Sequence, residues 1–230
     1  MTAAVTMAML GGQPLFGHLT QAQLGHAATH VHLSVVRRGA IVLSAEQPGE
    51  VAYVVVSGTL KVVQTSAGGA EVILGLVGPR DVVGELALID RGTRSADVVA
   101  LEDCELLWFD RNAFAQLRQA APVVMDNLLE LTSRRLRLAN RQIRALATLD
   151  VTGRVAMHLL ALADVYGVPD GSGTRIDLHH TQSDLAALCG ATRVRVNQSL
   201  MGFRKLDLIA DSADRRIVIL DADGLGAYAR

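Results

Sequence analysis

A short segment of the chain combines the residue types that hold a phosphorylated sugar. Gly84 and Glu85 are followed nine residues later by Arg94 and Ser95. Glycine lets a backbone approach a ligand closely, and the glutamate carboxylate is a good acceptor for ribose hydroxyls. An arginine, a hydroxyl and backbone N–H groups suit a single phosphate anion, and a short helix from Glu85 would point its amides at that anion. The alternative is a strand–turn–strand with a surface Glu–Arg pair.

A second segment, near the C-terminus, has the pattern of a helix-turn-helix. Thr181 can cap a first helix, and Gly190 lies where a tight turn needs positive φ. A second helix begins near Thr192 and turns three apolar residues inward: Val196, Leu200 and Phe203. Ser199 departs from the pattern, which usually has an apolar residue there, and Leu200 beside it would supply the packing. The two helices would cross closely over the small Ala186.

The second helix presents side chains that can read base edges. Its expected outward residues are Arg193, Val194, Arg195, Asn197 and Gln198. Arginine can bond guanine O6 and N7 together, and glutamine or asparagine can bond adenine N6 and N7. The alternative is a structural helix pair with a basic, solvated face and no role in DNA binding.

The elements that position the first segment are expected to be short strands. Thirteen of the 21 glycines lie in residues 1–92 and none in 93–152. Between the Gly and Pro turns, Val-rich runs predict an antiparallel sandwich or barrel. The predicted strands are Val31–Val36, Ile41–Ser44, Val51–Ser57, Leu60–Gln64, Glu71–Val77, Asp81–Val83, Ser95–Ala100 and Glu105–Phe109.

A long helix is expected next, over Val123–Thr152, which contains no Gly or Pro. Leu129, Leu136 and Ile143 recur every seven residues, which is typical of a coiled-coil seam between two copies of the chain. The alternative is a helix lying on its own domain. Residues 111–150 carry 7 basic and 3 acidic side chains, a net charge of +4, although the whole chain has −1.

The remaining elements complete a small C-terminal domain. We expect a helix over 154–166, a loop over Gly167–Gly173 and a strand over Arg175–Leu178. After the helix-turn-helix, Ile209–Leu220 predicts a hairpin with its turn at Asp211–Asp214, which makes the unit a winged helix.

Composition excludes several classes of protein. Only 8 residues are aromatic, so the core is aliphatic, and the two cysteines, Cys104 and Cys189, are too few for a disulfide framework or a four-cysteine metal site. No apolar run is long enough to cross a membrane and no signal peptide is evident, so we expect a cytoplasmic protein.

His30 and His32 lack further ligands for a cupin metal site. No nucleophile–base motif is present, so we expect no enzyme.

The two motifs and the helix between them, in this order, resemble the cyclic-AMP receptor protein / FNR family of bacterial transcription regulators. The resemblance covers about residues 14–225 and rests most on the GELAL…RSA segment and on Leu149–Ala156, which looks like the family's hinge. It implies an α+β fold with three parts. These are a cyclic-nucleotide-binding jelly-roll β-barrel over 1–120, a dimerisation helix and hinge over 121–150, and a winged helix-turn-helix DNA-binding domain over 151–230.

The resemblance also implies roles for individual residues. Cyclic AMP is the expected effector, and the residues that would bind it are Gly84, Glu85, Leu86, Arg94, Ser95, Ala96, Arg135, Ala139 and Asn140. Arg135 would pair with Glu85 of the GELAL…RSA segment, residues 84–96, which we call the cassette. Ala139 and Asn140 would meet the purine from the partner subunit, and Ala139 departs from the enterobacterial pattern by lacking a hydroxyl. The expected DNA-binding residues are Thr181, Thr192, Arg193, Val194, Arg195, Asn197 and Gln198. Val194 and Gln198 stand where enterobacterial relatives have other base-reading residues, so a related but different palindromic operator is expected.

The resemblance implies that the partners are double-stranded DNA, a second copy of the chain and RNA polymerase, with no membrane. No metal, haem or iron–sulfur cluster is expected, because no Cys precedes Cys104 and no His lies between His32 and His158. Two alternatives stay open. One is a family member that is constitutive or senses another ligand, and the other is a cyclic-nucleotide sensor that acts through a protein partner.

Overall fold

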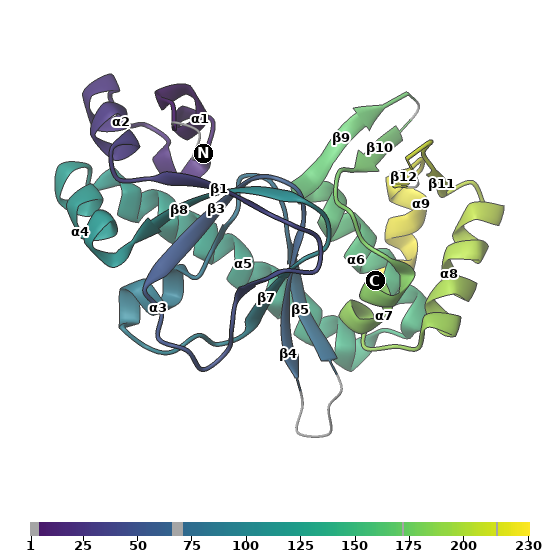
Figure 1. Cartoon of the computed structure of the whole chain (residues 1–230). Coiled ribbons are helices and arrows are strands. Elements are labelled where there is room, and N and C mark those ends of the chain that lie inside the picture. Colours follow the sequence, from purple (N-terminus) through teal and green to yellow (C-terminus); the bar gives the residue numbers. More distant parts are fainter. Residues whose placement is uncertain (1–4, 66–70, 172, 215) are drawn as a thin grey trace. The chain divides into compact units, whose positions relative to one another are not determined.

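The computed structural model describes residues 5–65, 71–171, 173–214 and 216–230. Its contacts divide the chain into two compact units, one of residues 5–65 and 74–135 and one of 136–230 with 71–73. None of the described helices is long and apolar enough to cross a membrane. Figure 1 labels most of the elements of both units.

The first unit is built on two four-stranded antiparallel sheets, in the orders β1-β8-β3-β6 and β2-β7-β4-β5. Valines and leucines alternate along these strands, and one cluster of buried residues from both sheets, including Val55, Leu60, Val98 and Leu106, fills the space between them. The sheets therefore pack face to face as the expected jelly-roll. The strands are β1 (His32–Val36), β2 (Ile41–Leu43), β3 (Val51–Ser57), β4 (Leu60–Thr65), β5 (Glu71–Val77), β6 (Val82–Val83), β7 (Asp97–Ala100) and β8 (Cys104–Asp110).

Helices cover the other face of the first sheet. A second buried cluster joins Phe109 of β8 to Phe16, Phe114 and Leu128 on these helices. Asn127 fixes the N-terminal segment by donating to the Leu15 and Gly17 carbonyls at 3.0 and 2.8 Å. The N-terminal helices and the helix after β8 were not predicted from the sequence. They are α1 (Met7–Gly11), η1 (Pro14–Phe16), α2 (Gln21–Ala28), α4 (Arg111–Ala120) and the first half of α5 (Val123–Thr148).

The long helix is shorter than predicted. The prediction of one helix over Val123–Thr152 was wrong at its end, because α5 stops at Thr148 and α6 (Val151–Tyr166) begins after two intervening residues. Asp150 has an extended backbone, and its Oδ1 accepts the Gly153 N–H at 2.8 Å as the cap of α6. A capping carboxylate favours a helix start over helix continuation. The hinge expected near Leu149–Ala156 is therefore a break between two helices.

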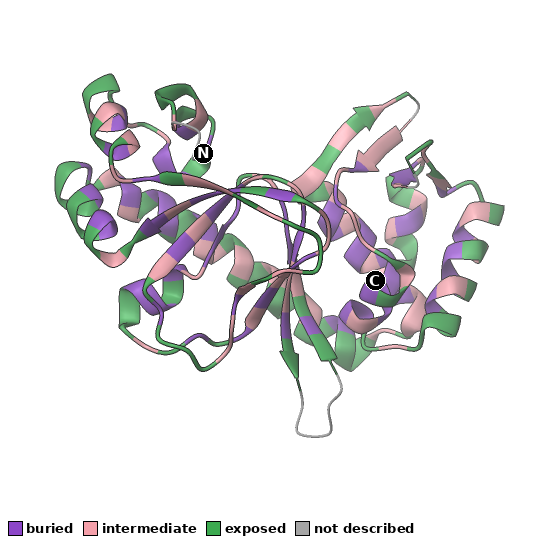
Figure 2. Ribbon diagram, viewed as in Figure 1, coloured by how far each residue is buried: buried purple, intermediate pink, exposed green. Residues whose placement is uncertain are grey.

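The second unit packs α6 against a helix-turn-helix and a small sheet of order β11-β12-β10-β9. Figure 2 shows buried residues along α6. The expected loop Gly167–Gly173 was wrong for most of its length, because Gly167–Asp170 is a strand that pairs with Gly173–Ile176. Gly171, at φ +55°, turns the chain between them. The elements are β9 (Gly167–Asp170), β10 (Gly173–Ile176), α7 (Gln182–Cys189), α8 (Arg193–Lys205), β11 (Ile209–Asp211), β12 (Ile217–Ile219), α9 (Ala222–Gly226) and η2 (Ala227–Ala229).

Arg154, in the first turn of α6, connects the helix break to the helix-turn-helix. Its Nη1 donates to the Leu149 carbonyl at 2.9 Å, and its Nε donates to the Cys189 carbonyl at 2.8 Å. Cys189 is the last residue of α7. One guanidinium therefore fixes Leu149, in the break between α5 and α6, to the C-terminal end of α7.

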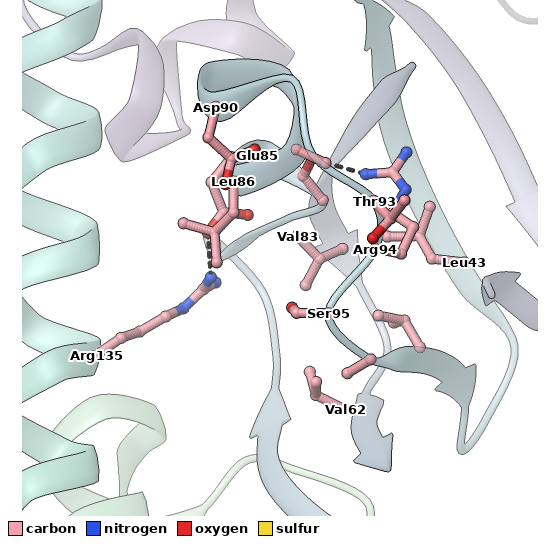
Figure 3. A pocket seen from close by; sticks show the side chains of 14 residues that line it. Leu43, Val62, Val83, Glu85, Leu86, Asp90, Thr93, Arg94, Ser95 and Arg135 are labelled. Carbon is pink, nitrogen blue, oxygen red and sulfur yellow. Dashed lines mark hydrogen bonds and ion pairs between the residues drawn. The ribbon is translucent and has the colours of Figure 1, made fainter. Parts of the chain in front are cut away.

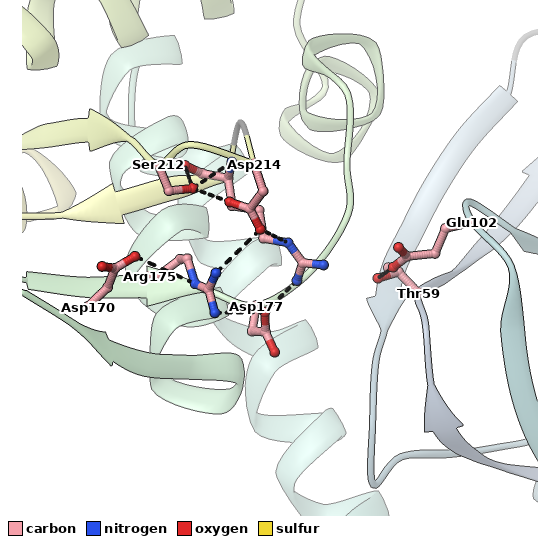
Figure 4. A network of polar contacts seen from close by, with 8 residues as sticks. Thr59, Glu102, Asp170, Arg175, Asp177, Ser212 and Asp214 are labelled. Atoms are coloured by element: carbon pink, nitrogen blue, oxygen red, sulfur yellow. Dashed lines mark hydrogen bonds and ion pairs between the residues drawn. The ribbon is translucent and has the colours of Figure 1, made fainter.

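A network of ion pairs holds the strands of the wing (Figure 4). Arg175 lies 3.3 Å from Asp214 and 3.6 Å from Asp177, and Arg216 contacts the same two carboxylates at 3.0 and 2.5 Å. Because the carboxylates are about half exposed, each pair contributes less than about 1 kcal/mol to stability. The network mainly fixes the geometry of the wing and neutralises its two described arginines.

Candidate functional site

The glycine that opens the cassette has a backbone that only glycine adopts easily. Gly84 has φ +82° and immediately precedes α3 (Glu85–Asp90). A Cβ at Gly84 would meet Arg94 Nη1 at 2.7 Å and the Val51 carbonyl oxygen at 3.0 Å. The sequence therefore needs glycine here both for the turn and for the close approach of Arg94.

A cavity of about 150 Å³ lies beside α3 and contains the cassette residues (Figure 3). Its apolar wall comes from both sheets, and its polar groups come from the cassette and from α5. The lining residues are Leu43, Val62, Val83, Gly84, Glu85, Leu86, Ala87, Asp90, Thr93, Arg94, Ser95, Ala96, Val98 and Arg135. The structure thus brings together seven of the nine residues that were expected to bind a nucleotide.

Glu85 and Arg135 form a charged pair at this cavity. Arg135 Nη1 donates to Glu85 Oε1 at 2.9 Å, and Nη2 of the same arginine donates to the Val82 carbonyl. Burial raises the pKa of Glu85, and the nearby Arg135 charge opposes that rise. Glu85 is only 5% exposed. The pairing implied by the resemblance is therefore present, and it joins the cassette to α5 within the first unit.

Arg94 has a second role that the sequence did not indicate. Its Nη1 donates to the Gly84 carbonyl at 2.8 Å and its Nη2 to the Val51 carbonyl at 2.6 Å. Burial lowers the pKa of this guanidinium, and the neighbouring Tyr53 and Glu85 oppose the effect. Arg94 therefore holds the cassette backbone and also adds a positive charge to the cavity wall. Ser95, which is exposed, lines the same cavity.

Arg111 holds the backbone of α3 by hydrogen bonds, a role that was not predicted from the sequence. Its Nη2 donates to the Gly49 carbonyl at 2.6 Å and to the Ala87 carbonyl at 3.2 Å, while Nη1 donates to the Leu88 carbonyl at 3.2 Å. These bonds satisfy carbonyls of the short helix α3. The only signal in the sequence is an arginine two residues after the predicted strand Glu105–Phe109, which is too common to indicate such a role.

Ala139 and Asn140 do not line the cavity. Both are exposed on α5, about one helical turn beyond Arg135. Their expected role requires a second copy of the chain, so it remains a prediction.

The helix-turn-helix forms as predicted. Thr181 caps α7 in a capping box with Asp184, and Thr192 caps α8. Gly190 has φ +59° and ends α7 in the left-handed region. Both threonine hydroxyls are therefore used in caps, and any contact of Thr181 or Thr192 with DNA remains a prediction.

The faces of α8 divide as expected. Val196, Leu200 and Phe203 are buried, whereas Arg193, Val194, Arg195 and Gln198 are exposed. Asn197 lies between the two faces, and Gln182 Nε2 donates to its Oδ1 at 3.2 Å. Ser199, which departs from the expected apolar pattern, is buried. Its hydroxyl has two hydrogen-bond partners: Thr152 Oγ1 at 3.0 Å and the Arg195 carbonyl at 3.2 Å. A serine is tolerated in the core here since its polar group is satisfied.

Comparison with known proteins decides the family. Residues 33–121 match the cyclic nucleotide-binding domain, and residues 153–228 match the Crp-like helix-turn-helix domain. The chain belongs to the CRP/FNR family. Its members are transcription regulators, so this CRP/FNR protein is a DNA-binding regulator with a cyclic-nucleotide-binding domain and is not an enzyme.

Individual relatives of this CRP/FNR protein differ in the ligand they are named for. A CRP-like cAMP-activated global transcriptional regulator of Mycobacterium tuberculosis is 33% identical over 84% of this chain and 86% of its own length. The cyclic AMP receptor protein of Thermus thermophilus is 34% identical, with coverage of 82% and 84%. The solved structure of the c-di-GMP responsive regulator CLP from Xanthomonas campestris is 25% identical, with a TM-score of 0.69 and coverage of 87% and 99%.

The described part of this CRP/FNR chain shows no group of three or more His, Cys, Asp or Glu side chains arranged as metal ligands. The two cysteines are buried and unpaired. Burial raises the pKa of Cys189 to about 12, so its thiol is protonated and unreactive near neutral pH.

His158 makes the DNA-binding unit of this CRP/FNR protein sensitive to acid. Burial, with a smaller contribution from the Arg154 charge, lowers its pKa from 6.5 to about 4. Because the folded-state pKa is below the unfolded value, the stabilisation is fully present above pH 6.5 and is lost as the pH falls toward 4. Between pH 7.5 and 5.0 we expect the free energy of unfolding of this unit to fall by about 2 kcal/mol through His158.

Thermal denaturation of wild type and His158→Gln at both pH values checks this prediction. The variant should lose less stability on acidification than wild type, whatever its stability at pH 7.5. His26→Gln, which changes an exposed histidine of the first unit, should keep the wild-type dependence. An unchanged pH dependence in His158→Gln would contradict the prediction.

Proposed function

We propose that the protein is a cyclic-AMP-responsive regulator that binds palindromic operators as a homodimer. The observation that carries the proposal is the cavity at α3, where a buried carboxylate, a cationic wall and an exposed hydroxyl meet, on the same chain as a helix-turn-helix. The curated relatives named as cAMP-activated or as cyclic AMP receptor proteins support cyclic AMP as the effector.

In this proposal each cassette group has one task. The Glu85 carboxylate and the Gly84 backbone bind the ribose, while Ser95 and the Ala96 amide bind the cyclic phosphate beside the Arg94 charge. Leu86 covers the ligand, and Arg135 keeps Glu85 oriented through the 2.9 Å contact. Ala139 and Asn140 of the second copy contact the purine.

An exposed apolar stripe on α5 supports the homodimer. Leu129, Leu136 and Ile143 are each about two thirds exposed at 66, 64 and 66%, and Leu146 is 58% exposed. Exposed leucine and isoleucine side chains at heptad spacing are typical of a coiled-coil seam. The arginines that flank this stripe on α5, such as Arg137 and Arg141, then lie outside the dimer contact. In this proposal the dimer directs its two α8 helices into successive major grooves, about 34 Å apart.

Control of DNA binding follows from two packings of the long helices. A ligand shifts an equilibrium only by its different affinity for the two states. Asn140 lies on the seam-bearing helix ten residues before Asp150, so a ligand that contacts Asn140 favours one packing of α5. That change reaches the DNA-binding unit through the break at Leu149 and Asp150. The regulator then acts on RNA polymerase at nearby promoters.

The test is isothermal titration of the dimer with cyclic AMP and with cyclic GMP. The protein is first freed of retained nucleotide by unfolding and refolding. We expect saturable binding of cyclic AMP, much tighter than binding of cyclic GMP. Absence of both heat and thermal stabilisation would overturn the assignment of cyclic AMP, and the cavity would then be tested with c-di-GMP.

Sensing of another ligand is the second candidate. It is favoured by the two Arg94 N–H bonds that go to backbone carbonyls and by the loss of a hydroxyl at Ala139. The c-di-GMP responsive relative from Xanthomonas campestris makes that dinucleotide the first alternative to titrate.

A further inference from the structure

The contact between Gln182 and Asn197 joins the two helices of the helix-turn-helix through side chains. Gln182 is the first residue of α7, and Asn197 lies in the second turn of α8. Gln182 Nε2 donates to Asn197 Oδ1 at 3.2 Å. Both residues are half-buried, so the bond is partly protected from water.

The bond sets the direction of the Asn197 amide. Since Oδ1 accepts from Gln182, Asn197 presents its two Nδ2 hydrogens away from α7. Within the described residues, no acceptor is bonded to Asn197 Nδ2. A free asparagine can offer adenine a donor and an acceptor together. Asn197 instead presents donors only, which suits an oxygen acceptor.

The position of Asn197 on α8 indicates which oxygen that is. At about 100° per residue, Asn197 is rotated by roughly a quarter turn from the buried Val196, so it lies on the flank of the helix. Val194 and Gln198 lie nearly opposite Val196, on the ridge that faces away from the core. In a helix-turn-helix the second helix enters the groove and the first helix crosses the phosphate backbone. The flank that contacts the start of α7 therefore lies next to the backbone.

We propose that Asn197 donates to a DNA phosphate and that Gln182 is the positioning residue that orients it. The inference rests on the DNA-binding role proposed above and deepens it, because it separates Asn197 from the base-reading residues. A backbone contact fixes the register of the protein on the duplex and carries no sequence information directly. Gln182 acts through Asn197 and makes no contact of its own with DNA.

The test compares four proteins: wild type, Gln182→Met, Asn197→Ala and the double variant. Methionine keeps the length of glutamine, but it cannot donate. Each dimer is titrated with cyclic AMP present against two duplexes, one selected from a random pool by wild type and one unrelated. We expect Asn197→Ala to weaken binding at least about tenfold on both duplexes, because each copy loses one hydrogen bond to a charged oxygen. Gln182→Met should weaken binding about threefold on both, because the amide is left free to rotate.

The double variant decides whether Gln182 acts through Asn197. We expect it to bind no more weakly than Asn197→Ala, since the positioning residue then has nothing to position. Multiplied losses would overturn the positioning role, and they are also what a general loosening of α7 would produce. Unchanged melting temperatures in the single variants are expected alongside.

Comparison of the two duplexes decides the identity of the acceptor. Equal losses on both support a phosphate, whereas a loss confined to the selected duplex means a base contact and overturns the proposal. Gln198→Ala, an amide removed from the outward ridge, is the matched control for a base contact. If wild type selects no duplex from the random pool, the proposed operator binding itself fails. If wild type binds and Asn197→Ala binds equally well, only this inference fails.

Discussion

Replacing Leu136 and Ile143 by glutamate is expected to convert the protein to a monomer. Both side chains are about two thirds exposed on α5 and would be buried only by a second copy. A dimer loses four apolar side chains from its seam, each worth about 1.5–3 kcal/mol, so association weakens by about 6 kcal/mol or more. The new carboxylates also face one another across the seam. Sedimentation at micromolar concentration should show one species of 24.5 kDa.

The same double variant should lose specific DNA binding. A monomer presents one recognition helix and contacts one half-site, so it forgoes the second set of contacts that a palindrome offers. We expect its affinity for the selected duplex to fall more than 100-fold, toward that for unrelated DNA. Arg141→Glu, on the side of α5 away from the seam, is the matched control and should stay dimeric. A Leu136/Ile143 variant that still sediments as a dimer would show that α5 does not form the interface.

Replacing Glu85 by glutamine is expected to remove most of the response to cyclic AMP. The substitution keeps the size of the side chain but removes the charge that receives the Arg135 N–H at 2.9 Å. The uncharged amide oxygen accepts more weakly from a ribose hydroxyl and from Arg135. A hydrogen bond to a charged group contributes about 1.5–3 kcal/mol, so the dissociation constant for cyclic AMP should rise about 10-fold to 150-fold.

The control for this second prediction is Glu50→Gln, a change to an exposed carboxylate of the same domain. It should bind cyclic AMP as wild type does. Both variants should remain dimeric, because neither residue lies on the stripe along α5. Titration calorimetry gives the dissociation constant, and a DNA titration with and without cyclic AMP gives the dependence on ligand. Wild-type affinity in Glu85→Gln would mean that the α3 cavity is not the cyclic AMP site.

The strands and the two motifs were predictable because their signals are local. Predicted Val51–Ser57 and Glu71–Val77 agree with the strands β3 and β5, since valine alternation between turn glycines depends on few residues. The cap at Thr181 and the left-handed Gly190 are local in the same sense. By contrast, α1 and α2 are short helices whose buried residues Leu10, Leu24 and Ala27 belong to one cluster with Phe109 and Leu128, and no local pattern encodes such packing.

The direction of long polar side chains could not be predicted. The sequence places Arg94 beside Ser95, which suggests that both bind one anion. In the folded chain the Arg94 guanidinium instead reaches back to the carbonyls of Gly84 and Val51, residues 10 and 43 positions earlier. The Gln182–Asn197 bond is missed for the same reason, because it spans fifteen positions and two helices. Such bonds depend on tertiary positions rather than on spacing.

The position of Arg154 has a mechanical consequence. Its guanidinium is a rigid plane that holds the Leu149 carbonyl at 2.9 Å and the Cys189 carbonyl at 2.8 Å at once. The last carbonyl before Asp150 and the turn that sets the angle of α8 thus move as one stiff body. We therefore expect a rotation of the chain at Leu149 to reach the end of α7, and through it α8, without an intervening flexible segment.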